Sequence, residues 1–481
     1  MKLSKTTPFA HQETGFNLAK DQVNFAYLCE QGTGKSLMAI RDSIYLFRTN
    51  KIVALVIAAP KGCYLNWQLN ELPAHMPEDV PYRVEVWVPP SSMSDTKKRV
   101  MQGFMDAIFT NTLKVFLVNV EALSHPDCPK YLTAFLRANK SIMVVDESST
   151  IRTPASSRSK NIIRVGKLAA YRRILTGTPV AERPLDLYGQ CAFLCRNLLG
   201  HDTFLTFKHY YANIVNIPTF AGRTFPKLVG YRRLNELTAD LDKFSFRVLK
   251  KDCLDLPEKI YQTRYVEATL QQKKLYNEMS QKMMLELEGA SCTAPIVLTK
   301  LLRLQCILCG HIKTDDGITK QVESNRIKTL LELIGEIDGK IIVWCKYRED
   351  VLSIMASLPK DIVGVDYHGG NTGTRKDNLE AFMNDPQVKL FVVTLGTGCR
   401  GLTLNMSSCS IYYSMGYSLE EWLQSQDRNH RIGQKNNVTY ISLVTPNSID
   451  EKIVKAVRDK EDVANTIVGN LKSYFSPITE Q

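Results

Sequence analysis

The sequence predicts an α/β protein built from two parallel-sheet lobes with helical insertions between them. Short apolar runs bounded by turn signals alternate with segments of helical period, which is typical of buried parallel strands joined by helices. This alternation occurs twice along the 481 residues. A chain of this length also exceeds one ordinary hydrophobic core, which favours two large units over one.

Five apolar runs in each half are predicted to form strands. In the first half they span 24–29, 52–59, 114–120, 141–146 and 173–176, and in the second half 340–344, 362–366, 389–394, 409–414 and 438–443. From about 185 to 328, strand signals are sparse and helical periodicity dominates. We therefore predict lobe 1 at 1–249, with a helical insertion at about 185–249, and lobe 2 at 250–481, with a helical protrusion at about 268–325. The Pro-containing run 252–259 marks the boundary.

Composition and charge narrow the choice of partner. The formal net charge of +12 attracts polyanions, although a basic balance alone does not separate nucleic acid from an anionic membrane surface. Nowhere do 18 apolar residues run together, and the first residues lack the apolar core of a signal peptide. The 12 Cys lie in or beside apolar stretches, as reduced core thiols do. We expect a cytoplasmic protein with no membrane partner.

A phosphate-binding loop follows the first predicted strand. In EQGTGKS, Gly32 and Gly34 let the backbone around Thr33 turn tightly and point N–H groups at phosphate oxygens, just before a predicted helix. Lys35 is placed to reach the terminal phosphates, and Ser36 is the natural magnesium ligand. Cys29 stands where the full motif has glycine. A chance match is the alternative, but the strand before and the helix after favour an ATP site.

An acidic pair ends the predicted strand 141–146. Asp146 and Glu147 would lie where open α/β sheets bind ligands. Asp146 is expected to hold Mg²⁺, and Glu147 to orient and deprotonate the attacking water. Taken alone, the pair could equally be a polar strand-end turn, because Asp, Glu and Ser are common there. The loop at Lys35 upstream favours catalysis.

Two arginines in the second half suggest how hydrolysis is completed. In QSQDRNHRIGQ, Arg428 and Arg431 are three residues apart, so on a helix they would share one face. Presented to a nucleotide on the other lobe, they would act as arginine fingers. A solvated basic helix face is the alternative. The length of the string favours the fingers.

Taken together, these strings resemble the Swi/Snf-type branch of superfamily-two helicases, and they follow one another in that family's order over nearly the whole chain. The matching strings are TPFAHQETG, CEQGTGKS, AAPKGCYLNWQLNE, VVDESSTIRTPASSRSK, ILTGTPVAERPLDLYG, DLPEK, IIVWCKYRED, FVVTLGTGCRGLTLN, QSQDRNHRIGQ and TPNSIDEKIVKAV. The resemblance implies two RecA-like lobes and a helicase-like ATPase that uses ATP and magnesium.

The resemblance also implies roles for further residues. Gln12 would contact the adenine base, Gln424 would lie at the nucleotide cleft, and Thr176 and Thr178 would couple hydrolysis to lobe movement. The residues that would face DNA are Lys61, Trp67 and Arg152 on the first lobe and Thr397, Asn405 and Tyr417 on the second. Core packing is the alternative for the two aromatic residues.

The chain departs from the family pattern at three places. Ser148 and Ser149 replace the usual Ala-His after the acidic pair, Arg400 stands where glycine is usual, and Tyr417-Ser418 replaces Trp-Asn. The residues expected to bind magnesium and hydrolyse ATP are unchanged. These departures therefore bear on the coupling of hydrolysis to DNA more than on hydrolysis itself.

The function expected from the resemblance is ATP-driven translocation on double-stranded or forked DNA. Fork remodelling, strand annealing or displacement of bound proteins would be its outputs, in a DNA-repair setting within a bacterial or phage-infected cytoplasm. We expect a monomer without an obligate protein partner. Two alternatives remain: an RNA-directed helicase or RNA-polymerase-recycling ATPase, and a nucleic-acid-binding module whose ATP site is vestigial.

Overall fold

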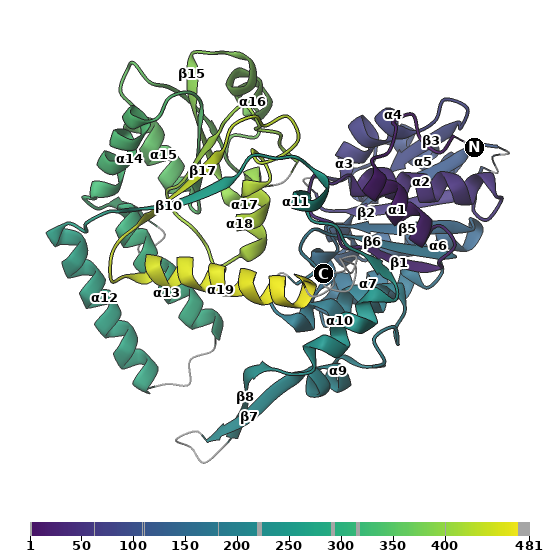
Figure 1. Cartoon of the computed structure of the whole chain (residues 1–481), viewed down its shortest axis with the longest axis horizontal. Helices are drawn as coiled ribbons and strands as arrows, with labels where there is room; N and C mark the ends of the chain where they lie inside the picture. The colour runs from purple at the N-terminus through teal and green to yellow at the C-terminus, as the bar shows by residue number, and fades with distance from the viewer. Residues whose placement is uncertain are drawn as a thin grey trace, which may run out of the picture. The chain divides into compact units, whose positions relative to one another are not determined.

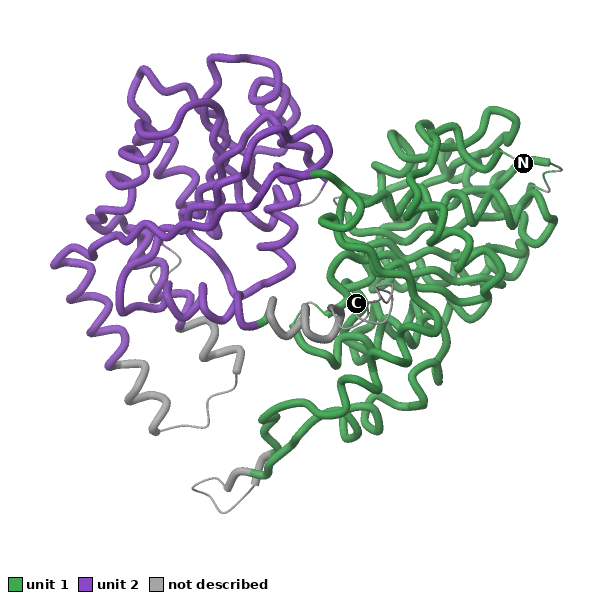
Figure 2. The backbone as a smooth tube through the Cα atoms, in the orientation of Figure 1, with its two compact units in different colours: residues 1–255, 460–481 green, residues 256–459 purple. Residues whose placement is uncertain are grey.

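A computed structural model describes residues 2–469 except 62, 108, 110, 181, 219–223, 290–293, 314–317 and 400. The chain divides into two compact units, which are coloured separately in Figure 2. Unit 1 comprises Met1–Asp255 with the segment from Lys460 onward, and unit 2 comprises Leu256–Asp459. We call them lobe 1 and lobe 2. The first division falls a few residues after 249, the position that the sequence suggested, whereas the segment from Lys460, which was expected in lobe 2, belongs to unit 1.

Lobe 1 is built on a seven-stranded parallel sheet (Figure 1). Its strands, in spatial order, are β3 (Tyr82–Val86), β4 (Leu113–Asn119), β2 (Ala54–Ala59), β5 (Ser141–Asp146), β6 (Tyr171–Leu175), β1 (Asn24–Tyr27) and β9 (Ser245–Phe246). Its helices are α1 (Ala10–Ala19), α2 (Lys35–Arg48), α3 (Tyr64–Asn66), α4 (Leu72–His75), α5 (Asp95–Asp106), α6 (Cys128–Ala138), α7 (Ser157–Gly166), α8 (Leu187–Leu194), α9 (Phe204–Tyr211), α10 (Leu234–Asp242) and α11 (Lys250–Cys253).

Strand β2 shows why this sheet is covered on both faces. All six of its residues are buried. Ala54, Val56 and Ala58 belong to one hydrophobic core, whereas Leu55, Ile57 and Ala59 belong to a second. Because successive side chains of a strand point to opposite faces, an uninterrupted apolar run requires a core on each side of the sheet. The unbroken apolar runs of the sequence are thereby explained.

Lobe 2 contains a six-stranded parallel sheet. Its order is β10 (Lys259–Tyr265), β17 (Val438–Val444), β16 (Cys409–Tyr412), β13 (Ile341–Cys345), β15 (Val388–Thr394) and β14 (Val363–Tyr367). Its helices are α12 (Leu270–Gly289), α13 (Ala294–Cys309), α14 (Asn325–Glu336), α15 (Arg348–Ala356), α16 (Arg375–Asn384), α17 (Leu395–Gly398), α18 (Leu419–Gln426) and the first part of α19 (Ile449–Gly469), whose residues from Lys460 belong to unit 1. The α/β class with two parallel-sheet lobes is thus confirmed.

The region between the sheets is not wholly helical, which corrects the expectation for 185–249. An antiparallel hairpin of β7 (Ala212–Pro218) and β8 (Thr224–Tyr231) follows α9, and a second small hairpin joins β11 (His311–Lys313) to β12 (Thr319–Gln321). The long hairpin extends away from the helices of lobe 1 in Figure 1. No helix among the described residues has both the length and the apolar character of a membrane span.

Candidate functional site

The candidate nucleotide site lies at the carboxyl ends of three adjacent strands of lobe 1. In the sheet order, β5, β6 and β1 are neighbours. The phosphate loop follows β1, the acidic pair ends β5, and Thr176 directly follows β6. Parallel strands bring such segments to one edge of the sheet, which is where open α/β sheets bind ligands. The fold therefore brings together the first-lobe motifs that the sequence analysis singled out.

Both glycines of the phosphate loop have the left-handed backbone that their residue type allows. Gly32 has φ of 83° and Gly34 has φ of 85°. A Cβ on Gly34 would also lie 2.1 Å from Gln12 Nε2, so a larger residue would collide with that amide. Helix α2 starts at Lys35, and no side chain caps its N-terminus. Its first N–H groups are therefore directed to the position that a phosphate would occupy.

Lys35 is held inside the loop by main-chain oxygens. Its Nζ donates to Cys29 O at 2.9 Å and to Glu30 O at 3.1 Å, and the residue is only 8% exposed. The hydroxyl of Thr33 donates to Glu30 O at 2.7 Å, which closes the turn. Ser36 follows in the first turn of α2 and is half-buried. The ammonium group is thus restrained beside the loop backbone.

Gln12 reaches the phosphate loop directly. Its Nε2 donates to Thr33 O at 3.0 Å, while its Oε1 accepts from the backbone N–H of Phe9 at 2.9 Å. The ring of His11 also contacts Thr33 O, at 2.8 Å. These bonds tie the N-terminus of α1 to the loop, so a nucleotide that moves the loop would also move α1.

Asp146 and Glu147 have different environments. Asp146 Oδ2 accepts from Trp67 Nε1 at 2.9 Å. Burial raises the pKa of Asp146, and the Trp67 hydrogen bond and the charge of Lys35 oppose that rise. Glu147 has the left-handed φ of 48°, and its Oε1 accepts from Gln31 Nε2 at 3.0 Å. The carboxylate expected to orient water is therefore positioned by the phosphate loop itself.

The segment after β6 packs against the same loop. Thr176 is fully buried, and its Oγ1 accepts from the backbone N–H of Thr178 at 3.1 Å. A Cβ on Gly177 would lie 3.1 Å from the backbone N of Gln31. This segment therefore packs directly against the phosphate loop, and the coupling role of the two threonines stays a prediction.

The three first-lobe residues expected to face DNA do not share one environment. Lys61 is exposed, and its backbone N–H donates to Glu121 Oε2 at 3.0 Å. Arg152 forms an ion pair with Glu182 at 2.9 Å. Trp67 is only 2% exposed and belongs to the core that also contains Leu55. The expected DNA contact of Trp67 is therefore corrected, because its indole is enclosed and directed at Asp146.

In lobe 2, Arg428 and Arg431 converge on one carbonyl. Arg428 Nη1 donates to Leu402 O at 3.1 Å, and Arg431 Nη1 donates to the same oxygen at 3.4 Å and to Thr403 Oγ1 at 2.8 Å. Helix α18 ends at Gln426. The expectation that both arginines lie on one face of a helix is thus wrong. They lie in the turns that follow the helix.

The remaining second-lobe candidates are partly enclosed. Gln424 is 1% exposed, and its backbone carbonyl oxygen accepts from Arg428 Nε at 3.0 Å. Thr397 Oγ1 accepts a hydrogen bond from Thr394 Oγ1 at 2.9 Å, and Asn405 Nδ2 donates to Ile432 O at 3.3 Å. Tyr417 is half-buried, and burial raises its pKa. Arg400 lies outside the described residues.

Lys250 also lies at the phosphate loop, which was not predicted from the sequence. The chain after β9 continues beside β1, because Leu28 N donates to Phe246 O at 2.9 Å and Glu30 N donates to Val248 O at 3.0 Å. This pairing brings Lys250 to the phosphate loop, where its Cε would lie 3.5 Å from a Cβ on Gly32. Lys250 is 5% exposed. In the sequence, the only indication of this position was a pair of lysines directly after a short apolar run.

Ser148, one of the departures from the family pattern, has a structural partner. Its hydroxyl donates to Gln190 Oε1 at 2.7 Å, and both residues are fully buried. Gln190 Nε2 in turn donates to Pro179 O at 2.7 Å. The residue after the acidic pair is thereby connected to the segment that follows β6.

The residues of lobe 1 fit a magnesium nucleotide. Among the described residues, no group of three or more His, Cys, Asp or Glu could hold a metal by itself. Magnesium in phosphoryl-transfer sites is commonly bound by one or two protein oxygens together with the substrate phosphates. Ser36 and Asp146 would supply those oxygens, while Lys35 and the uncapped N-terminus of α2 would bind the phosphates.

Two protein-family models match the chain, and both describe domains of helicase-like ATPases. The SNF2-related domain matches residues 18–312, which is more than half of the chain, and the helicase conserved C-terminal domain matches residues 325–433. The chain belongs to the SNF2 family. The family resemblance suggested by the motifs is thereby confirmed, and the chain carries the two domains of a helicase-like ATPase.

The SNF2-family relatives span several kinds of organism. The chain is 25% identical over 94% of its length to nuclear protein STH1/NPS1 of Saccharomyces cerevisiae, of which it covers 34%. It is 26% identical over 94% of its length to an uncharacterized ATP-dependent helicase of Mycoplasma pneumoniae, and 23% identical over 98% to the DNA annealing helicase and endonuclease ZRANB3 of Bos taurus. It covers 41% of each of these two relatives.

The chain spans between a fifth and about two fifths of the length of these curated relatives. Among solved structures, the Sulfolobus solfataricus SWI2/SNF2 ATPase core in complex with dsDNA matches 99% of this chain and 96% of its own, with 20% identity and a TM-score of 0.42.

Proposed function

We propose that this SNF2-family chain is an ATP-driven translocase on double-stranded DNA. The observation that carries the proposal is the meeting of Lys35, the acidic pair and the Thr176 segment at one edge of the lobe 1 sheet. Each of these groups has a role in phosphoryl transfer, and the contact between Gln31 and Glu147 joins the phosphate loop to the proposed water-positioning carboxylate.

In this proposal, Lys35 and the N-terminus of α2 bind the triphosphate. Magnesium, when bound, neutralises charge on the phosphate oxygens. Glu147 orients the attacking water and accepts its proton, while Asp146 remains ionised with the help of the Trp67 hydrogen bond. Arg428 and Arg431 stabilise the charge that develops on the transferred phosphoryl group when the lobes close. Within lobe 2, Leu402 O accepts a hydrogen bond from each guanidinium group and so restrains both.

Double-stranded DNA is proposed as the track for two reasons. The name of the bovine relative describes a DNA annealing helicase, and the net charge of +12 favours a polyanion. Contacts to the phosphate backbone carry no base code, so binding should be independent of sequence and should weaken strongly with salt. Remodelling of forks or displacement of bound proteins would then follow from tracking.

The test measures ATP turnover with blunt duplex, forked DNA, single-stranded DNA and RNA, together with displacement of a DNA triplex. The proposal expects the duplex to stimulate turnover most, and the triplex strand to be released only with ATP. A Lys35→Ala protein should do neither. Equal stimulation by RNA would overturn the duplex track, and unchanged turnover of Lys35→Ala would overturn the assigned ATP site.

A further inference from the structure

Four successive α-helices of lobe 1, α6 to α9, carry no acidic residue within their bounds. They are α6 (CPKYLTAFLRA), α7 (SRSKNIIRVG), α8 (LYGQCAFL) and α9 (FLTFKHYY). The whole chain has 49 Asp and Glu in 481 residues, whereas these four helices have none and carry six Lys and Arg, so the helices themselves are positively charged. We call the outer side of these helices the α6–α9 surface.

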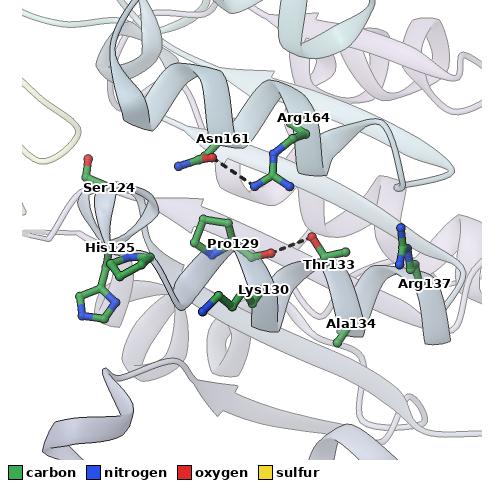
Figure 3. A pocket seen from close by; sticks show the side chains of 10 residues that line it. Ser124, His125, Pro129, Lys130, Thr133, Ala134, Arg137, Asn161 and Arg164 are labelled. Atoms are coloured by element: carbon green, nitrogen blue, oxygen red, sulfur yellow. Dashed lines mark hydrogen bonds between the residues drawn. The ribbon is translucent and has the colours of Figure 1, made fainter.

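The first of two hollows on this surface lies between α6 and α7 (Figure 3). It is open and has a volume of about 540 Å³. Arg164 extends from α7 toward α6, while Lys130 and Arg137 lie along α6. Pro129 and Ala134 line the hollow between these cations. It therefore has an apolar wall with positive charge around it.

The second hollow lies on the other side of α7, against α8 and α9. Its volume is about 370 Å³. Arg164 lines this hollow as well, so one guanidinium stands between the two. Its other cations are Lys160, Lys167 and Arg196, and its apolar lining includes Ile163, Ala192 and Phe204. Neither hollow is lined by a carboxylate.

Most of these cations lack a counter-charge in the part of the chain that the structure describes. Lys130 forms an ion pair with Asp127 at 3.1 Å, within one turn of helix. Arg164 donates to the amide oxygen of Asn161, at 3.2 Å. Among the residues that the structure describes, Arg137, Lys160 and Lys167 make no ion pair. A concentration of exposed, uncompensated cations attracts an anionic partner and speeds its association.

The apolar linings decide which anion fits. A phosphate backbone needs cations but gains nothing from apolar recesses. An acidic protein segment with interspersed apolar side chains would use both features, because its carboxylates pair with the cations while its apolar groups leave water. We propose that the α6–α9 surface binds an acidic protein segment whose apolar side chains enter the two hollows on either side of Arg164.

The test uses a fluorescent synthetic peptide in which Glu alternates with Leu and Phe, titrated with the full chain at low salt. Arg164→Glu reverses the shared cation, and Ala134→Trp fills the first hollow without changing charge. Arg99→Glu is the matched control, because Arg99 is an exposed arginine on α5 outside the surface. A second peptide has Ser in place of Leu and Phe. Circular dichroism checks that each variant folds.

The proposal expects the wild-type and Arg99→Glu proteins to bind the peptide equally, and Arg164→Glu to weaken binding about tenfold. Ala134→Trp and the Ser peptide should each also weaken binding. Absence of binding by the wild type, or equal binding by Arg164→Glu, would overturn the proposal. Equal binding of the Ser peptide, or a short DNA duplex that displaces the peptide and is itself weakened by Arg164→Glu, would identify a general polyanion or nucleic-acid surface instead.

Discussion

The indole Nε1 of Trp67, which belongs to a hydrophobic core of lobe 1, donates to Oδ2 of the half-buried Asp146 over 2.9 Å. This bond joins the segment after β2 to the proposed magnesium carboxylate at the end of β5. Because burial raises the pKa of Asp146 and the Trp67 bond opposes that rise, the indole helps to maintain the ionised form.

Trp67→Phe should keep most of the packing but lose this bond. The pKa of Asp146 should rise, so the acid limb of the ATPase pH profile should move to higher pH. The affinity for magnesium should fall about 10- to 100-fold, as when outer-shell partners of metal ligands are removed. Trp87→Phe is the control, because Trp87 is equally buried, at 3% exposure, in the other core of lobe 1. A loss of DNA affinity with an unchanged pH profile would instead favour a DNA role for Trp67.

Gly34→Ala should disable the phosphate loop. The backbone at Gly34 has φ of 85°, and the added Cβ would lie 2.1 Å from Gln12 Nε2. Strain of about 1–2 kcal/mol is expected from the backbone alone, before the collision is counted. Binding of a fluorescent ATP analogue should therefore weaken strongly. Gly103→Ala is the matched control, because a Cβ there meets nothing within 4 Å and α5 should be slightly stabilised. Equal nucleotide affinity of the two variants would contradict the loop assignment.

Asp350 should make the stability of lobe 2 depend on pH. Burial raises its pKa to about 7, although Ser414 donates a hydrogen bond to the carboxyl group. The raised value means that the folded protein holds a proton that the unfolded chain releases between about pH 4 and 7. The contribution of this group to the free energy of unfolding therefore falls as pH rises through that range.

Asp350→Asn should remove this dependence. Relative to wild type, the variant should gain about 2–4 kcal/mol of stability on going from pH 5 to pH 8. The measurement is the difference between the thermal midpoints of the two proteins across that range, which cancels the titration of groups that do not contact Asp350. Because His311 Nδ1 lies 3.4 Å from the Asp350 carboxyl group, the comparison is repeated in a His311→Gln background. A difference that does not change with pH would show that Asp350 is ionised throughout.

The parts of the fold that depend on local pattern could be predicted from the sequence. Central strands such as β5 and β15 are buried on both faces, so their apolar runs are unbroken and stand out. Three edge strands, β3, β9 and β10, were not recognised in this way, whereas the edge strand β14 was predicted at 362–366. Strand β10 (KIYQTRY) is mostly exposed and lacks such a run, and β9 has only two residues.

At the nucleotide site, the contacts between segments that are distant in sequence could not be predicted. Lys250 reaches the phosphate loop only because the chain after β9 pairs with β1, more than 200 residues away in sequence. The burial of Trp67 could not be predicted either, because an aromatic residue just after a strand can pack in a core or lie on the surface. Which of the two occurs depends on contacts with distant segments. The motif residues themselves were placed correctly at the strand ends, because their positions relative to the apolar runs are local.

The most direct test of the two-lobe mechanism is ATP turnover by Arg431→Ala at saturating duplex DNA, with ATP affinity measured in parallel. Lys435→Ala is the control, because Lys435 is an exposed cation four residues further along the chain. The account predicts near-normal ATP affinity and a loss of turnover of about a thousandfold, with Lys435→Ala unaffected. Turnover of Arg431→Ala that stays within about twofold of wild type would contradict the account, because hydrolysis would then need no guanidinium from the second lobe.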